Sequence, residues 1–414
     1  MGVKLGKPTI SPRQAAPGDG RTFSDAGDRT LILDLVERCS GSVDAWESTV
    51  YSGSGAHRYP VDARRGALYF DATKGGGGVA AAGRVLRSLR ALRHDPPGYA
   101  KQGSRRAMFQ SALEQCEQFL GAAGDTGYAT QPVQLFYALS QAGRAIVASS
   151  PRVGNQAWRV SGHGLTANTN AAVAADVMVT ATRVGLFPAV ASALGVEALV
   201  PDEPVALREL WPLLPETVDV PFTADAMLPV LFFFQDGWPK IGPFVGAEVK
   251  GIPRRVLDLY GQDRVRIKEH LDHYPALRGC MLRVPLRVSQ PMGGRDWGCR
   301  GPGMGLSVEW RSASPPLMLL GPKTLSDLGV ACYRSDDDSV VTPAIGSMAT
   351  GLHPFLALWA VLLALSSLAR YEPATWSKMI NIDRSAEANA IEHLLEEAKT
   401  SVPAAVLHLL NTFR

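Results

Sequence analysis

The chain has 414 residues, of which 46% are hydrophobic and 20% charged, so it can form one large globular domain or two ordinary ones. Its formal net charge of +3 excludes a surface that is basic throughout, so a site for nucleic acid has to be local. The five cysteines are scattered and form no CxxC pair, which argues against a disulfide framework and a thiolate zinc site and favours a cytoplasmic location.

The first hundred residues combine polar sequence with short patterned segments. Residues 1–28 lack the apolar stretch of a secretory signal and predict a flexible tail. Residues 30–38 predict a short amphipathic helix, 67–70 a short strand, and 79–93 a longer helix. The glycine-rich run before this last helix matches the G-x-G-x-x-A pattern at 76–81. No second strand ending in an acidic residue follows it, so we interpret it as a linker and expect no cofactor.

In the rest of the chain, regions of predicted helix alternate with a region of predicted strands. Periodic apolar residues predict helices at 104–122, 131–148, 171–182 and 188–193. From residue 201 prolines are frequent, and apolar or alternating runs predict strands at 231–234, 279–288, 305–310 and 317–320. After residue 343 helices are predicted at 355–369, 386–399 and 403–411.

The helix at 355–369 carries no charge over its fifteen residues, which is too short for a membrane span and predicts a helix buried against 131–148. We therefore expect no membrane partner and a mainly α protein with a β-containing middle segment (α+β). The predicted parts are a tail (1–28), a helical region with the glycine-rich loop and a basic helix (29–200), a proline-rich mixed region with strands (201–345), and C-terminal helices (346–414) packing on 104–200.

Three sequence blocks together carry a family resemblance. They are EQCEQ at 114–118 leading into QPVQLFYALSQAGRAI at 131–146, then His163-Gly164-Leu165, and LSSLARYEPATW at 365–376. Together with LRELWPLLP at 207–215, they resemble the YaaC-like family of bacterial intracellular proteins, from about Leu113 to Leu410. The resemblance implies a cytoplasmic, largely helical protein, and it brings no established catalytic residues.

Three residues within these blocks are candidates for a site. His163 stands between two glycines. An imidazole there can act as an acid, as a base or as a hydrogen-bond donor to a phosphate, or it can simply hydrogen-bond a helix end. Arg144 and Arg370 lie near the ends of apolar helices, where a guanidinium meets a carboxylate or the last helical carbonyls. Alternatively, the three residues form one anion pocket of a metal-independent phosphate-processing enzyme.

A second catalytic pattern is weaker. HEPN-type ribonucleases, helical nucleases of bacterial defence systems, place an arginine and a histidine four to six residues apart on one helix. Arg264 with His270 and Arg266 with His273 lie near that spacing, which chance also produces in a chain with 42 Lys and Arg. The segment 269–273 is not a zincin motif and the acidic run 336–338 lacks the rest of a calcium loop, so no metal site is predicted.

The strongest physical signal is a basic stripe, which we define by seven residues: Arg84, Arg87, Arg90, Arg93, Lys101, Arg105 and Arg106. Against one acid, Asp95, these seven charges give a local net charge of +6, compared with +3 for the whole chain. Such a stripe is either a solvated face paired with acids elsewhere or a phosphate-binding surface. We predict a protein that binds nucleic acid or another polyanion through the basic helix, with the phosphate-processing enzyme and a non-catalytic protein-interaction scaffold as alternatives.

Overall fold

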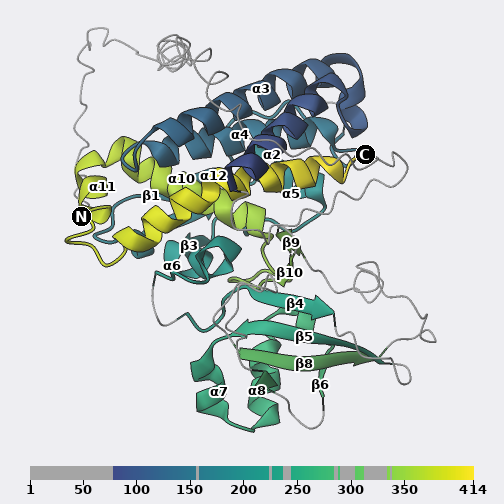
Figure 1. Ribbon diagram of the computed structural model, residues 1–414, viewed down its shortest axis with the longest axis vertical. Helices are drawn as coiled ribbons and strands as arrows, with labels where there is room; N and C mark the ends of the chain where they lie inside the picture. The colour runs from purple at the N-terminus through teal and green to yellow at the C-terminus, as the bar shows by residue number, and fades with distance from the viewer. Residues whose placement is uncertain are drawn as a thin grey trace, which may run out of the picture. The chain divides into compact units, whose positions relative to one another are not determined.

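The computed structural model describes residues 78–154, 158–222, 226–235, 244–283, 288–289, 304–311, 333–335 and 338–414. The predicted tail, the helix at 30–38 and the strands at 67–70 and 317–320 lie outside these residues. Helices predominate in the described part, which also contains two antiparallel sheets (Figure 1), so the predicted α+β class is confirmed.

Three successive helices open the described chain: α2 (Gly78–His94), α3 (Gly103–Asp125) and α4 (Gln131–Ser149). They confirm the helices predicted at 79–93, 104–122 and 131–148. Pro96 and Pro97 end α2 because proline cannot continue a helix, and the short connection between α3 and α4 makes these two helices antiparallel neighbours. Pro132 occupies the first turn of α4, where its missing N–H costs nothing.

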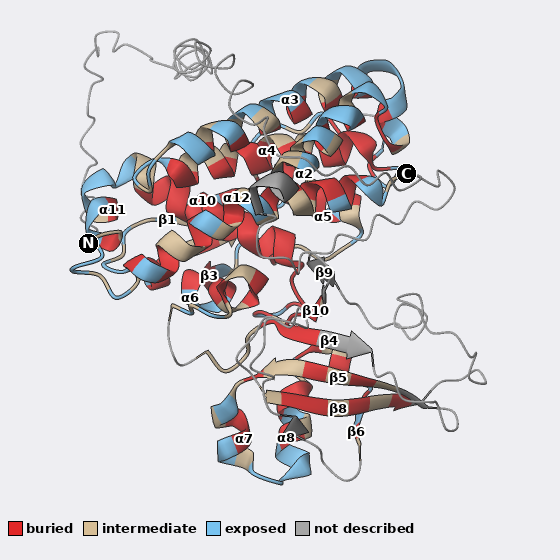
Figure 2. Cartoon of the chain, in the orientation of Figure 1, coloured by how far each residue is buried: buried red, intermediate tan, exposed pale blue. Residues whose placement is uncertain are grey.

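The helix α10 (Pro354–Tyr371) forms the centre of the core, and every residue from Pro354 to Leu368 is buried (Figure 2). It packs against α4, as predicted for residues 355–369. At 18 residues the helix is longer than the 15 residues predicted, so its length and apolar composition alone would suit a membrane span, but 83% of the apolar window is buried inside the protein. This burial is typical of the core helix of a globular protein. The short helices α5 (Leu186–Leu194) and α11 (Pro373–Met379) also contribute to this core.

The final helix, α12 (Ala388–Asn411), corrects one prediction. Helices were expected at 386–399 and 403–411, but one continuous helix runs through Pro403. Proline removes one backbone hydrogen bond and costs about 3 kcal/mol inside a helix. Val402, Val406 and Leu410 are buried around it, and their burial offsets that cost.

The smaller sheet corrects a second prediction. Its strands are β1 (Leu165–Asn168), β2 (Met178–Ala181) and β3 (Pro204–Ala206), in the antiparallel order β1-β2-β3. A helix was expected at 171–182, because alanine is frequent there. The segment instead forms a 3-10 turn, Ala174–Asp176, followed by β2, whose residues alternate between partly exposed and buried. Pairing with strands on both sides overrides the local helix propensity of the alanines.

The larger sheet has the order β6-β8-β5-β4-β10-β9, with β7 also paired to β8. Its strands are β4 (Leu231–Gln235), β5 (Phe244–Ile252), β6 (Met281–Leu282), β7 (Val288–Ser289), β8 (Met304–Arg311), β9 (Tyr333–Ser335) and β10 (Asp338–Val341). The strands predicted at 231–234 and 305–310 are confirmed. The segment predicted at 279–288 holds β6 and the start of β7, and residues 284–287 lie outside the described residues. Two helices, α7 (Arg254–Tyr260) and α8 (Arg264–Leu271), share a core with this sheet.

The buried side chains form two main clusters. The first joins residues from 89 to 214 with residues from 345 to 410, and the second lies between residues 231 and 341. The helix α6 (Leu207–Leu210) and the following 3-10 turn, Trp211–Leu213, belong to the first cluster and contact α10. Arg144 and Arg370 lie on α4 and α10, which belong to the first cluster, and His163 lies in the loop before β1.

Candidate functional site

The backbone around His163 is fixed on the first turn of α5. The carbonyl groups of Gly162 and His163 accept hydrogen bonds from the N–H groups of Leu186 and Phe187, at 3.1 and 2.9 Å. These donors are among the N–H groups that a helix leaves unpaired at its start. The loop therefore supplies hydrogen-bond acceptors to the first turn of α5. These hydrogen bonds in turn fix the loop that carries the imidazole.

The glycines beside His163 are required by this arrangement. Gly164 has a φ of +78°, and a Cβ atom there would lie 2.5 Å from Cδ of Pro188. Gly185, with a φ of +127°, passes so close to this loop that a Cβ atom added to it would lie 2.4 Å from Cα of Gly164. Residues with side chains rarely adopt these backbone angles, and here they also lack space.

The imidazole of His163 shares two aromatic neighbours with Arg370. Its ring centre lies 5.1 Å from that of Phe136 and 6.5 Å from that of Tyr137. The guanidinium carbon of Arg370 lies 5.9 and 5.8 Å from the same two rings. Arg370 also donates a hydrogen bond from Nη1 to the Tyr137 hydroxyl at 3.3 Å. The helices α4 and α10 and the loop before β1 thus bring the two residues together.

Arg144 completes the group that we call the anion cluster: Arg144, His163 and Arg370. Arg144 lies seven residues after Tyr137, so both side chains project from the same face of α4. Its Nη1 donates to the carbonyl of Val160 at 3.0 Å, and burial lowers the pKa of its guanidinium. It lies close enough to His163 to affect the pKa of the imidazole.

The anion cluster carries positive charge without a compensating acid. Burial, followed by the charges of Arg370 and Arg144, lowers the pKa of His163 below its usual 6.5, so the imidazole is neutral at pH 7. Among the described residues, no carboxylate pairs with either arginine. The carbonyls of Val160 and Ser366 accept hydrogen bonds instead. Two half-buried guanidiniums that lack a carboxylate partner are poised for an external anion.

A family model described as YaaC-like protein matches residues 87–410. The chain belongs to the YaaC-like family. No curated protein and no solved structure matches the chain. The YaaC-like region begins at Arg87, within α2, and so includes most of the basic helix as well as the anion cluster. The resemblance seen in the sequence began only at Leu113.

Within the YaaC-like region, Arg105 has to be removed from the basic stripe. Its side chain is 8% exposed, and the guanidinium donates hydrogen bonds to carbonyls at the end of α4 and just beyond it. The acceptors are the carbonyls of Ala148, Ser150, Val153 and Gly154. Arg105 therefore joins α3 to the chain that follows α4, and it is not available to a polyanion.

Two further stripe residues are paired with acids of α3. Arg90 forms an ion pair with Glu117 at 2.8 Å, and Arg93 forms one with Glu114 at the same distance. These pairs hold α2 against α3, so their charges are largely neutralised locally. The exposed stripe residues without an ion pair to a described acid are Arg84, Arg87, Lys101 and Arg106.

The arginines and histidines of the HEPN-like pattern do not converge. Arg264 donates to the carbonyl of Leu282 at 2.7 Å, and Arg266 pairs with Asp263 at 3.5 Å. His270 is buried, and this burial lowers the pKa of its imidazole to about 4. His273 lies beyond the end of α8, so it does not share a helix with Arg266.

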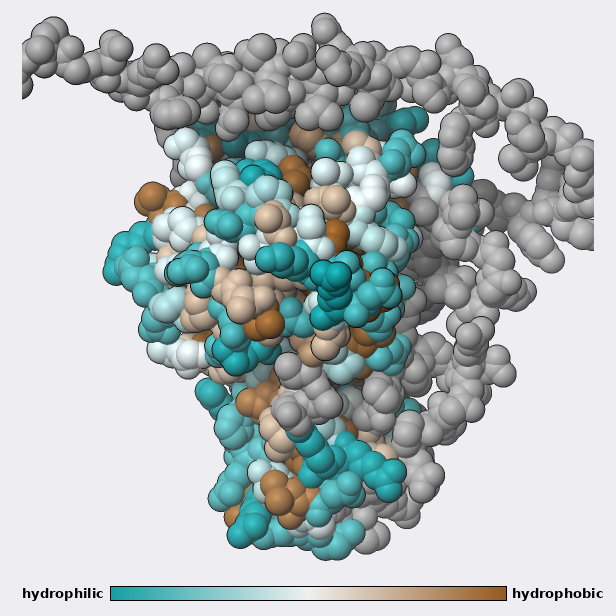
Figure 3. All heavy atoms as spheres, turned by 90° about the vertical axis from the view of Figure 1, so that its left-hand side faces the viewer, coloured by the Kyte–Doolittle hydropathy of each residue, from teal (hydrophilic) through white to brown (hydrophobic). Residues whose placement is uncertain are grey.

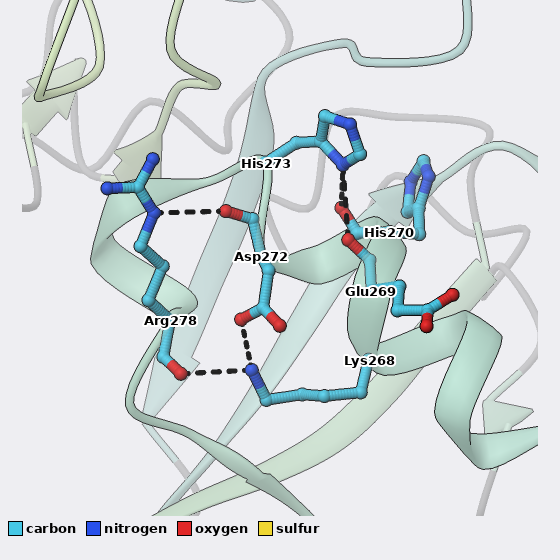
Figure 4. Close-up of polar contacts among 6 residues, drawn as sticks. All are labelled: Lys268, Glu269, His270, Asp272, His273 and Arg278. Atoms are coloured by element: carbon cyan, nitrogen blue, oxygen red, sulfur yellow. Dashed lines mark hydrogen bonds and ion pairs between the residues drawn. The ribbon is translucent and has the colours of Figure 1, made fainter.

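Polar contacts in this region are structural (Figure 4). The amine of Lys268 contacts Asp272 and donates to the carbonyl of Arg278, while the His273 ring faces the carbonyls of Glu269 and His270. These contacts close the turn that follows α8. Across the described ranges, no group of three or more His, Cys, Asp or Glu side chains is arranged to hold a metal ion.

Proposed function

We propose that this protein binds a phosphate-like anion at the anion cluster. One observation carries the proposal: Arg144 and Arg370 are half-buried beside a neutral imidazole, with no described carboxylate paired to them. Removing a guanidinium from water is costly unless an opposite charge compensates it. A bound anion supplies that charge.

The hydrogen-bonding capacity of the cluster supports the same conclusion. A guanidinium has five N–H donors. Arg144 donates one hydrogen bond, to the carbonyl of Val160, and Arg370 donates two, to the carbonyl of Ser366 and the hydroxyl of Tyr137. The remaining N–H donors of the two arginines and the one N–H of the neutral His163 imidazole suit the several acceptor oxygens of a phosphate. The rings of Phe136 and Tyr137 displace water from one side, which strengthens these charged contacts.

Replacing Arg144 or Arg370 with glutamine is expected to abolish stabilisation by phosphate. A ligand that binds only the folded state raises the unfolding temperature, with about 2.7 kcal/mol of stabilisation at a concentration 100 times its Kd. Thermal unfolding in inorganic phosphate, at constant ionic strength, measures this effect. The control is Arg254→Gln, which removes the same charge from an exposed arginine of α7. Equal phosphate response in the parent and the Arg144 variant would contradict the proposal.

His163 gives the same experiment a second readout. A bound anion offsets the charges of Arg144 and Arg370, so it favours the imidazolium and raises the pKa of His163 from its lowered value. The anion consequently binds more tightly as the pH falls through the pKa of His163. An NMR titration of the imidazole with and without phosphate checks the direction. Turnover of a phosphate monoester that is lost in His163→Gln would extend binding to metal-independent phosphate processing.

Weak binding of polyanions is the second candidate function, now restricted to the exposed stripe residues without an ion pair to a described acid: Arg84, Arg87, Lys101 and Arg106. Replacing Arg84 and Arg87 with glutamine is expected to weaken nucleic-acid binding at low salt more than replacing Arg90 and Arg93. Both double variants change the net charge by two, but the second pair is already bound to Glu117 and Glu114. Fluorescence anisotropy with a single-stranded oligonucleotide at two salt concentrations measures the difference. Equal losses would show that only total charge matters.

The scaffold alternative has less support. On the face drawn in Figure 3, hydrophobic areas are small and lie between hydrophilic ones. Most exposed large apolar side chains among the described residues lie on separate elements, such as Tyr99, Val184 and Ile382, whereas Val265 of α8 and Met281 of β6 line one shallow groove. A contiguous apolar patch is what a docking surface for a protein would require. A cytoplasmic location belongs to the proposal, supported by the scattered cysteines, of which Cys116 and Cys280 are free and buried.

A further inference from the structure

A shallow groove lies on α3 beside the anion cluster. One wall is a single face of α3, where residues recur at helical spacing, and the other is the segment 158–161. The lining residues are Ser104, Ala107, Met108, Ser111, Trp158, Arg159, Val160 and Ser161. The groove is wide open to solvent, and its volume of about 560 Å³ is comparable with the roughly 300–1,000 Å³ of small-molecule sites.

The groove and the anion cluster meet at Val160. This residue lines the groove, and its carbonyl accepts the hydrogen bond from Arg144. The pairing of α3 with α4 gives the same placement: Phe119 stacks on Tyr137 with ring centres 5.5 Å apart, and Arg105 reaches the carbonyl of Ala148. Between these two contacts the antiparallel helices bring the end of the groove level with Arg144. The groove therefore ends beside Arg144.

The groove offers a ring-binding surface with hydroxyl groups along it. Met108 and Val160 supply apolar surface, and the guanidinium of Arg159 lies 5.0 Å from the centre of the Trp158 ring. Arg159 is exposed, so the face of its planar guanidinium that points away from Trp158 can stack on a second ring. Three serine hydroxyls in the lining can hydrogen-bond a sugar or the edge of a base.

Resting on the proposed anion binding, the geometry points to a nucleoside phosphate as the ligand, with its phosphate on Arg144, His163 and Arg370 and its base and sugar in the groove. The shared chemistry is a terminal phosphate monoester joined to one nucleoside. Such a group occurs in a free mononucleotide and at the 5′ end of a nucleic acid.

The test compares adenosine 5′-monophosphate, ribose 5-phosphate, adenosine and inorganic phosphate by calorimetry with the full chain. The mononucleotide is expected to bind at least tenfold more tightly than ribose 5-phosphate, because only it places an aromatic base in the groove. Ala107→Trp, which fills the groove from an exposed position of α3, should remove that advantage and leave inorganic phosphate binding unchanged. Ala386→Trp, at an exposed position before α12, is the matched control and should change neither.

The outcomes separate this inference from the proposed function. Binding of inorganic phosphate without any advantage for the mononucleotide overturns the inference and leaves the anion site in place. Absence of binding by both ligands overturns both. Retention of the mononucleotide's advantage in Ala107→Trp also overturns the groove assignment. A 5′-phosphorylated dinucleotide, compared with its 5′-hydroxyl form, distinguishes the free nucleotide from a nucleic-acid end as the source.

Discussion

Replacing Leu362 with aspartate is expected to unfold the protein or to destabilise it by more than about 4 kcal/mol. Leu362 is fully buried in the middle of α10, and the residues before and after it in that helix are buried as well. An aspartate there loses the transfer free energy of the leucine and places a carboxylate in a buried apolar stretch of α10. Urea denaturation followed by circular dichroism measures the change in the free energy of unfolding.

A matched substitution separates burial from the loss of a leucine in a helix. Leu259 lies in α7 and is 63% exposed, so Leu259→Asp should cost less than about 1 kcal/mol. Similar unfolding midpoints for the Leu362 variant and the parent would mean that α10 is not the centre of the core.

Replacing Gly143 with alanine is the second change with a large expected effect, a destabilisation of about 1–3 kcal/mol. A Cβ atom at this position of α4 would lie 2.2 Å from Cη2 of Trp359 and 3.0 Å from a methyl group of Val190. Trp359 is fully buried and is held edge to face by Phe187 and Phe355, so its ring has no space into which to move. Glycine allows α4 and α10 to approach closely at the tryptophan.

The control has the opposite expected sign. Gly121 lies in α3, and a Cβ atom at this position would have nothing within 4 Å of it. Gly121→Ala should therefore stabilise the protein by up to about 1 kcal/mol through helix propensity alone. Thermal or urea unfolding of both variants gives the two signs. Combining Gly143→Ala with Trp359→Leu should cost less than the sum of the two single changes, because the smaller side chain admits the methyl group. Stabilisation by Gly143→Ala alone would contradict the close contact.

Local sequence patterns predicted most helices and strands that have one buried face. They failed where pairing with distant segments determines the secondary structure. The helix at 131–148 was readable because its apolar residues recur at spacings of three and four. The segment 171–182 was not, because its alanines favour a helix and only the neighbouring strands β1 and β3 make it extended. Pro403 predicted a helix start, because proline is tolerated in the first turn of a helix. One helix instead continues through Pro403, because the residues around it are buried.

The candidate site shows the same limit. The setting of His163 between glycines and the positions of Arg144 and Arg370 in apolar helices were visible in the sequence. Their approach to one another was not, because it depends on the crossing of α4 and α10. Phe136 and Tyr137 were missed, although Tyr137 lies on the same helical face as Arg144, which was a usable signal. Nothing local distinguishes the buried Arg105 from Arg106, its exposed neighbour.

The shared core of residues 89–214 and 345–410 has a consequence for biosynthesis. When α4 leaves the ribosome, the surface that will cover α10 has no partner, because α10 is encoded about 200 residues later. At roughly 5–20 residues per second, that interval lasts about 10–40 s. During this time the apolar face of α4 that contacts α10 in the folded protein lacks that partner. The order of the segments in the gene thus determines how long this surface of α4 stays exposed while the protein is synthesised.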